Sequence, residues 1–129
     1  MNRTVVEQAR LWKATTVLIE DRASGTQLIQ ELRHEGVYVI KSYEPPAGQD
    51  KVMRMHAASS LIENGFVFLP ENAEWLAEYV REVKAFPNGK YDDQVDSTAQ
   101  ALDWIKQGYL NRNVVRIFKF YPLYDSHEV

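Results

Sequence analysis

Three aspartates, Asp92, Asp93 and Asp96, follow a turn-forming Pro-Asn-Gly stretch at 87–89 and begin a segment with helical periodicity. On a helix, residues three and four apart share a side, so Asp96 can converge with Asp93 or with Asp92. Like charges at this spacing repel by roughly 0.2–0.5 kcal/mol, a cost that a bound divalent cation removes. The alternative is structural: Asp92 or Asp93 caps the helix, and the acids favour the positive end of its dipole.

A second acidic pair, Glu20 and Asp21, ends the apolar stretch 15–19, which predicts a short strand buried on both faces. In open α/β sheets, ligands bind at the carboxyl ends of strands. If the helix that begins near Asp92 packs across the sheet with its N-terminus there, the two acidic groups meet. Such an oxygen site suits Mg²⁺ or Mn²⁺ and phosphodiester hydrolysis. Alternatively, Glu20 and Asp21 are loop acids that pair with Arg22.

The hydrophobic pattern predicts alternating helices and strands around one core. Helices are expected over 4–13, 24–35 and 51–64, with a fourth that begins near Asn72 and a last one from Asp92 to Gly108. Strands are expected over 15–19, 37–43, 66–69 and 114–121. The strand–helix–strand order over 15–43 indicates a parallel crossover. Ser24 and Gln27 fit a capping box, Gly36 and Asn64-Gly65 fit helix ends, and Asn72 fits a cap.

Apolar residues at helical spacing are expected to face the core. They are Val52, Met55, Ala58, Ser59 and Ile62 in the third helix, Trp75, Leu76, Tyr79, Val80 and Val83 in the fourth, and Val95, Ala99, Leu102 and Ile105 in the last. Lys51 and Arg54 lie on the first turn of the third helix, where the dipole disfavours cations. A solvated face explains these two residues most simply, and contact with phosphate groups is the alternative.

The composition indicates one soluble domain of 129 residues, with 45% hydrophobic residues and a net charge of −3. Without cysteine, neither disulfides nor thiolate metal sites can form, and the three widely separated histidines make zinc an unsuitable metal. No apolar run is long enough to span a membrane. The sequence contains no GxxxxGK[ST], GxGxxG or GxSxG motif.

Four segments together resemble the C-terminal nuclease domain of the large terminase subunit of tailed phages and prophages. They are IEDRASGTQLIQEL at 19–32, EPPAGQDKVMRM at 44–55, NGFVFLP at 64–70 and FPNGKYDDQVDSTAQAL at 86–102. The resemblance is specific because four motifs occur in order with suitable spacing, whereas each alone is weak.

The resemblance implies a ribonuclease-H-like α/β fold, with a mixed sheet flanked by helices. It also implies two Mg²⁺ or Mn²⁺ ions held by acidic residues that cut double-stranded phage DNA during packaging. The implied catalytic and metal-binding residues are Glu20, Asp93 and Asp96, with Asp21 and Asp92 in second rank, and the DNA-binding residues are Lys51, Arg54 and Lys90. Further implied partners are the ATPase motor domain, the small terminase subunit and the portal, in the cytoplasm of a bacterial host.

The chain departs from the family at its start. The family's first catalytic acid lies on the first strand of the fold, and nothing before Glu20 corresponds to it. We therefore expect an N-terminally truncated piece that lacks the first strands and the motor domain. Residues 1–108 would form a partial nuclease domain, and residues 109–129 an extension with an edge strand and an irregular tail. Such a piece is expected to bind metal but to be inactive, or only weakly active, in cleaving DNA.

Two other functions fit the sequence. A fragment without its first strands would expose a sheet edge and apolar surface, which favours self-association. An α/β domain that binds a small phosphorylated ligand is the third candidate, although no glycine-rich phosphate loop supports it.

Overall fold

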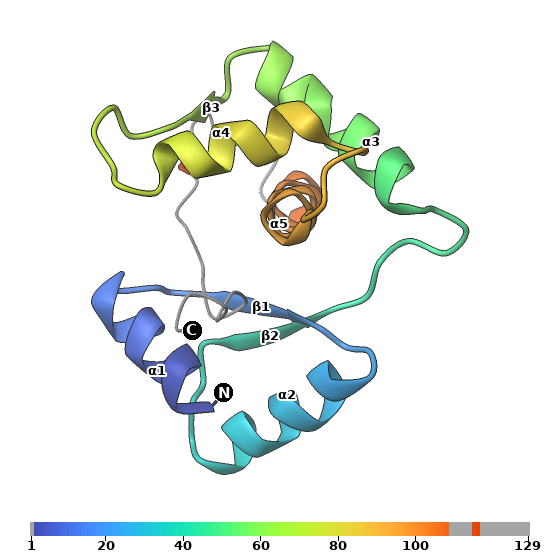
Figure 1. Cartoon of the computed structure of the whole chain (residues 1–129). Coiled ribbons are helices and arrows are strands. Elements are labelled where there is room, and N and C mark those ends of the chain that lie inside the picture. Colours follow the sequence, from blue (N-terminus) through green and yellow to red (C-terminus); the bar gives the residue numbers. More distant parts are fainter. Residues whose placement is uncertain (1, 109–114, 117–129) are drawn as a thin grey trace. The chain divides into compact units, whose positions relative to one another are not determined.

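The structure, a computed structural model, describes residues 2–108 and 115–116. Helices and short parallel strands alternate along the chain, as the hydrophobic pattern predicts (Figure 1). The described residues fall into two compact units, one up to Pro46 and one from Ala47 onward. Each unit has its own hydrophobic core. The expected division into residues 1–108 and 109–129 stays a prediction, since most of the second part lies outside the described residues.

The first unit contains α1 (Asn2–Leu11), β1 (Val17–Glu20), α2 (Ser24–His34) and β2 (Ile40–Tyr43). The two strands pair in parallel, from Val17 opposite Ile40 to Glu20 opposite Tyr43, which confirms the predicted crossover. Its core is formed by the buried side chains of Val5, Ile29, Leu32 and Ile40. The residues of β1 are half-buried, so the prediction of a strand buried on both faces is wrong for this unit. Among the described residues β2 is its one partner strand.

The turn between β1 and α2 brings the start of the helix onto the end of the strand. A Cβ atom at Gly25 would overlap the carbonyl oxygen of Glu20, so only glycine fits this approach. The residue before the helix is Ala23, at a positive φ of 54°, and it makes no side-chain cap bond. The predicted Ser24 capping box is therefore wrong, because Ser24 is already the first residue of the helix.

Two helices end in the way that their glycines predict. At the end of α2, Gly36 has a φ of 85°, and the amides of Gly36 and Val37 donate to the carbonyls of Arg33 and Leu32. This is the Schellman arrangement, which only a residue tolerant of positive φ accommodates well. Gly65, with a φ of 78°, ends the next helix in the same way.

The second unit contains α3 (Lys51–Glu63), β3 (Val67–Phe68), α4 (Leu76–Ala85), α5 (Asp93–Gly108) and β4 (Val115–Arg116). The strands β3 and β4 pair in parallel, with Val67 opposite Val115. Buried Ala58, Tyr79 and Leu102 form the core, and α5 packs against both α3 and α4 (Figure 1). The predicted apolar face of α5 is confirmed, since Val95, Ala99 and Leu102 are buried. The remaining positions of the late strand predicted over 114–121 lie outside the described residues.

Two predictions for this unit are wrong. Val52 and Ile62 were expected to face the core, but they are 49% and 39% exposed. The buried face of α3 is centred on Ala58, with Leu61 beside it. The residue that precedes α4 is Trp75, without a side-chain cap, so Asn72 does not cap this helix. By contrast, the Asp50 side chain caps α3 by accepting from the amide of Met53 at 2.9 Å.

In the part of the chain that the structure describes, no helix is both long and apolar enough to cross a membrane.

Candidate acidic site at the start of helix α5

The start of α5 is held by a carboxylate from the neighbouring helix. Glu82 of α4, which is 8% exposed, accepts from the backbone amide of Val95 at 2.9 Å and from Nε2 of Gln94 at 2.9 Å. The first-turn amides of a helix lack partners within it, and the positive end of the dipole favours an anion. The sequence suggested Asp92 or Asp93 as the cap and missed Glu82. A signal was present, because Glu82 falls within the apolar stripe of α4, between Tyr79 and Val83.

The polar contacts continue along the α4–α5 interface. Oγ1 of Thr98 donates to the carbonyl of Gln94 at 2.8 Å, so the Tyr79 hydroxyl, 2.6 Å from the same oxygen, is the donor in their contact. Burial raises the pKa of Tyr79, and the negative charge of Glu82 raises it further. Among the described residues, no buried side-chain polar atom lacks a hydrogen bond. A fully bonded buried network of this kind fixes two helices in one register.

Two of the predicted acids converge on one cation. Nζ of Lys51, from α3, lies 3.0 Å from Oδ2 of Asp92 and 3.4 Å from Oδ2 of Asp96. The guanidinium of Arg54, one turn further along α3, lies 3.9 Å from Oδ1 of Asp96. The Arg54 side chain is only 18% exposed, so the interpretation of Arg54 as part of a solvated face is wrong. The two acids and the two bases form one mixed-charge cluster.

The protonation of this cluster is set by burial and by its charges. Burial raises the pKa of Asp96, and the neighbouring charge of Asp92 raises it further. The charges of Lys51 and Arg54 oppose that rise without cancelling it. The hydrogen bond to Asp92, followed by the charge of Asp96, raises the pKa of Lys51, so its ammonium is retained at neutral pH. The folded chain therefore disfavours the charged form of Asp96.

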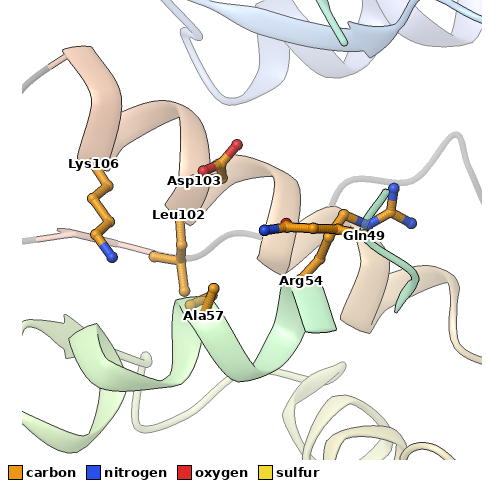
Figure 2. Close-up of a pocket in the computed structure, with 7 residues that line it drawn as sticks. Gln49, Arg54, Ala57, Leu102, Asp103 and Lys106 are labelled. Carbon is orange, nitrogen blue, oxygen red and sulfur yellow. The ribbon is translucent and has the colours of Figure 1, made fainter. Parts of the chain in front are cut away.

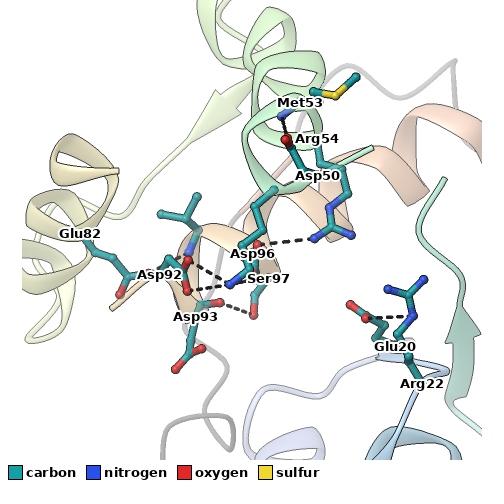
Figure 3. A network of polar contacts seen from close by, with 12 residues as sticks. Glu20, Arg22, Asp50, Met53, Arg54, Glu82, Asp92, Asp93, Asp96 and Ser97 are labelled. Carbon is teal, nitrogen blue, oxygen red and sulfur yellow. Dashed lines mark hydrogen bonds and ion pairs between the residues drawn. The ribbon is translucent and has the colours of Figure 1, made fainter. Parts of the chain in front are cut away.

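Asp93 takes no part in this cluster. Its side chain is exposed, and Figure 3 shows its carboxylate pointing away from Asp92 and Asp96. Its backbone carbonyl accepts from the Ser97 hydroxyl at 3.0 Å. In this geometry Asp92, rather than Asp93, shares the Lys51 ammonium with Asp96. The assignment of Asp93 as a metal ligand remains a prediction.

The other predicted acids belong to the first unit. Glu20 lies at the carboxyl end of β1, and its Oε2 is 4.0 Å from Nε of Arg22, with the Arg22 side chain 66% exposed and the Glu20 side chain 40% exposed. Asp21 accepts from the Thr26 hydroxyl at 2.8 Å, which ties the strand end to the first turn of α2. Both acids thus have the local partners expected of loop acids. Their part in a metal site remains a prediction.

The carboxylates of Asp92 and Asp96 are the oxygen ligands that Mg²⁺ or Mn²⁺ would find in this cluster. Asp92 and Asp96 offer convergent carboxylate oxygens within reach of one cation, as Mg²⁺ or Mn²⁺ requires. Across residues 2–108 and 115–116, no three His, Cys, Asp or Glu side chains are grouped to hold a metal ion. The pair therefore fits part of a coordination sphere.

The predicted phosphate-binding residues have different surroundings. Lys51 and Arg54 are engaged by the acids, whereas the Lys90 ammonium lies 5.3 Å from the centre of the Tyr91 ring, with both side chains exposed. Arg54 also lines a pocket of about 30 Å³ between α3 and α5, over Ala57 and Leu102 and beside Asp103 and Lys106 (Figure 2). That volume holds a water molecule and is far too small for a nucleotide.

Replacing Glu82 with glutamine should lower the free energy of unfolding by about 1–2 kcal/mol, because an amide is a weaker partner for the Val95 amide than a carboxylate. Chemical denaturation at pH 7 measures the loss. Glu74→Gln removes the same charge from an exposed position just before α4 and serves as the control. Equal stabilities for the two variants would contradict the role of Glu82.

Asp96→Asn should raise the melting temperature at pH 7. A carboxyl with a raised pKa binds its proton more tightly in the folded chain, so the wild type loses stability as the pH rises from 3.8, its ordinary value, through the folded pKa. The variant escapes this loss, so the difference should vanish below pH 3.8 and grow above it. Thermal melts from pH 3 to pH 7 test this, with exposed Asp93→Asn as the control. A destabilised Asp96→Asn protein at pH 7 would show that its ion pairs outweigh its burial.

A comparison with known protein families identifies the family of the chain. A family model described as a terminase RNaseH-like domain matches residues 1–103, which include both acidic groups. No curated protein and no solved structure matches the chain significantly. The mixed α/β architecture, with parallel strands and flanking helices, is consistent with a ribonuclease-H-like domain. With four-fifths of its length matched, the chain belongs to the family of terminase RNaseH-like domains.

Proposed function

We propose that this domain supplies part of the metal-dependent nuclease centre of a phage or prophage DNA-packaging terminase. Its substrate is double-stranded phage DNA, and its working place is the cytoplasm of a bacterial host. The observation that carries the proposal is the convergence of Asp92 and Asp96 within reach of one cation, in a member of the terminase RNaseH-like family. The ATPase motor domain, the small terminase subunit and the portal are its proposed packaging partners.

The proposed metal ligands are Glu20, Asp93 and Asp96, with Asp21 and Asp92 as further candidates. Mg²⁺ or Mn²⁺ bound by these oxygens would stabilise the charge that develops on the attacking and leaving oxygens of a phosphodiester. The geometry favours Asp92 beside Asp96, since their carboxylates converge while that of Asp93 is exposed. The inclusion of Glu20 rests on the sequence motifs.

The proposed DNA-binding residues are Lys51, Arg54 and Lys90. Contacts between basic side chains and phosphates position DNA without reading its sequence. Lys90 is exposed and available for such a contact. Lys51 and Arg54 lie beside the acids, so phosphate contacts by these residues would place the DNA backbone next to the metal ligands.

Calorimetry with Mn²⁺ and a plasmid-nicking assay test this proposal. The wild-type chain should bind Mn²⁺, and Asp96→Ala and Asp92→Ala should each weaken binding at least tenfold, because either change removes a ligand. Asp103→Ala, on the same helix but beside the pocket, should bind normally. Nicking by the chain should be slow, and it should disappear in a variant carrying Glu20→Ala and Asp96→Ala.

Two results would refute this proposal. One is the absence of Mn²⁺ binding by the folded wild-type chain. The other is undiminished nicking after both Glu20 and Asp96 have been replaced, which would place the chemistry elsewhere.

Self-association is a second candidate property, and a specific surface favours it. Ile62, Phe66, Phe68 and Leu69, at the end of α3 and along β3, are each between 39% and 57% exposed. Val67 points to the core between Phe66 and Phe68, as the alternation of side chains along a strand requires. An apolar patch of this kind often marks a contact surface.

Light scattering coupled to size-exclusion chromatography would reveal self-association as a mass above 15.0 kDa. Phe68→Ser should shift the population toward the monomer, whereas exposed Tyr38→Ser in the first unit should not. A wild-type chain that stays monomeric at high concentration would exclude this candidate.

A further inference from the structure

The Lys51 ammonium occupies the position that a shared metal ion would need. Its Nζ lies 3.3 Å and 3.0 Å from the two carboxylate oxygens of Asp92 and 3.4 Å from Oδ2 of Asp96. The carboxylates are four residues apart on one helix, and their repulsion is offset by a cation between them. Lys51 supplies that cation from α3, a separate helix.

The cluster is close to electrically neutral. Arg54 approaches the opposite oxygen of Asp96, at 3.9 Å from Oδ1, so two cations face two anions. A divalent ion coordinated by both carboxylates would lie within a few ångströms of the ammonium. Like charges at such a separation repel strongly in a partly buried site. The ammonium and the metal therefore cannot both occupy the space between Asp92 and Asp96.

We propose that Lys51 is a built-in competitor of the catalytic metal. Its ammonium holds Asp92 and Asp96 together in the metal-free protein and swings away when a divalent ion binds them. The flexible four-carbon stem of lysine permits this movement. The inference rests on the proposed function and adds its regulation. The freed ammonium would remain close to the acids and become available for a DNA phosphate, so that metal binding would precede tight DNA binding.

The test compares Mn²⁺ binding and thermal stability in the 129-residue chain. Lys51→Met keeps the apolar stem but removes the charge, so it should bind Mn²⁺ roughly two- to tenfold more tightly than the wild type. In EDTA its melting temperature should fall by a few degrees, because the acids lose their cation. Saturating Mn²⁺ should close that gap, since tighter binding adds stability.

Two further variants sharpen the comparison. Lys84→Met removes the same charge from an exposed position in the last turn of α4, and it should match the wild type in both measurements. Lys51→Arg keeps the charge, and its guanidinium pairs more firmly with carboxylates, so it should weaken Mn²⁺ binding.

Equal or weaker Mn²⁺ binding by folded Lys51→Met, with normal binding by the wild type, would overturn the inference alone. If neither protein binds Mn²⁺, the proposed function fails together with the inference. A melting-temperature gap that is unchanged by Mn²⁺ would also count against competition, because it would show that Lys51 acts only as a structural ion pair. If Lys51→Met does not fold, the Lys51→Arg comparison decides the question in the same way.

Discussion

The bond from the Val95 amide to the buried Glu82 carboxylate fixes where α5 begins, and the geometry of the acidic cluster depends on that start. The backbone amides at the start of a helix have no hydrogen-bond partners within that helix. A buried helix start therefore needs an acceptor from elsewhere. Glu82 supplies it from α4, while Gln94 and Thr98 extend the contact along the interface. Asp92 and Asp96 lie on the turn held in this way. Their convergence is therefore a property of helix packing and not of the acidic sequence alone.

The interface between α3 and α5 changes character along its length. It is apolar at Ala58 and Leu102, and it becomes a cluster of opposite charges where Lys51 and Arg54 meet Asp92 and Asp96. For Asp96, the desolvation that comes with burial outweighs the attraction of both cations, and its pKa is raised. A carboxylate kept at a cost to folding is typical of a functional site. The proposed metal site would give a chemical reason for keeping it.

The sequence predicted most of the fold where periodicity or backbone geometry leaves one choice. The apolar positions of α5 admit a single buried face, and Gly36 and Gly65 are needed for the positive φ angles that end α2 and α3. The predicted capping box at Ser24 was wrong because the chain turns at Ala23, a non-glycine residue with positive φ that no capping pattern reveals.

The sequence also left open which face of α3 is buried and which residues contact the acids. In α3, apolar residues occur on more than one face, and the partner helix selects the face with Ala58 and Leu61. The sequence predicted that Asp96 could converge with Asp92, but it did not reveal the Glu82 bond or the contact of Lys51 with both acids. Both are long-range contacts between different helices, and local spacing does not encode them.

The close approach at Gly25 has a consequence for reading related sequences. The first turn of α2 lies so close to the Glu20 carbonyl that no side chain fits between the strand end and the helix. A side chain at this position would force a different route from strand to helix. Glycine at position 25 therefore marks relatives that share this strand-to-helix turn. Such relatives also share the position of the acid that corresponds to Glu20.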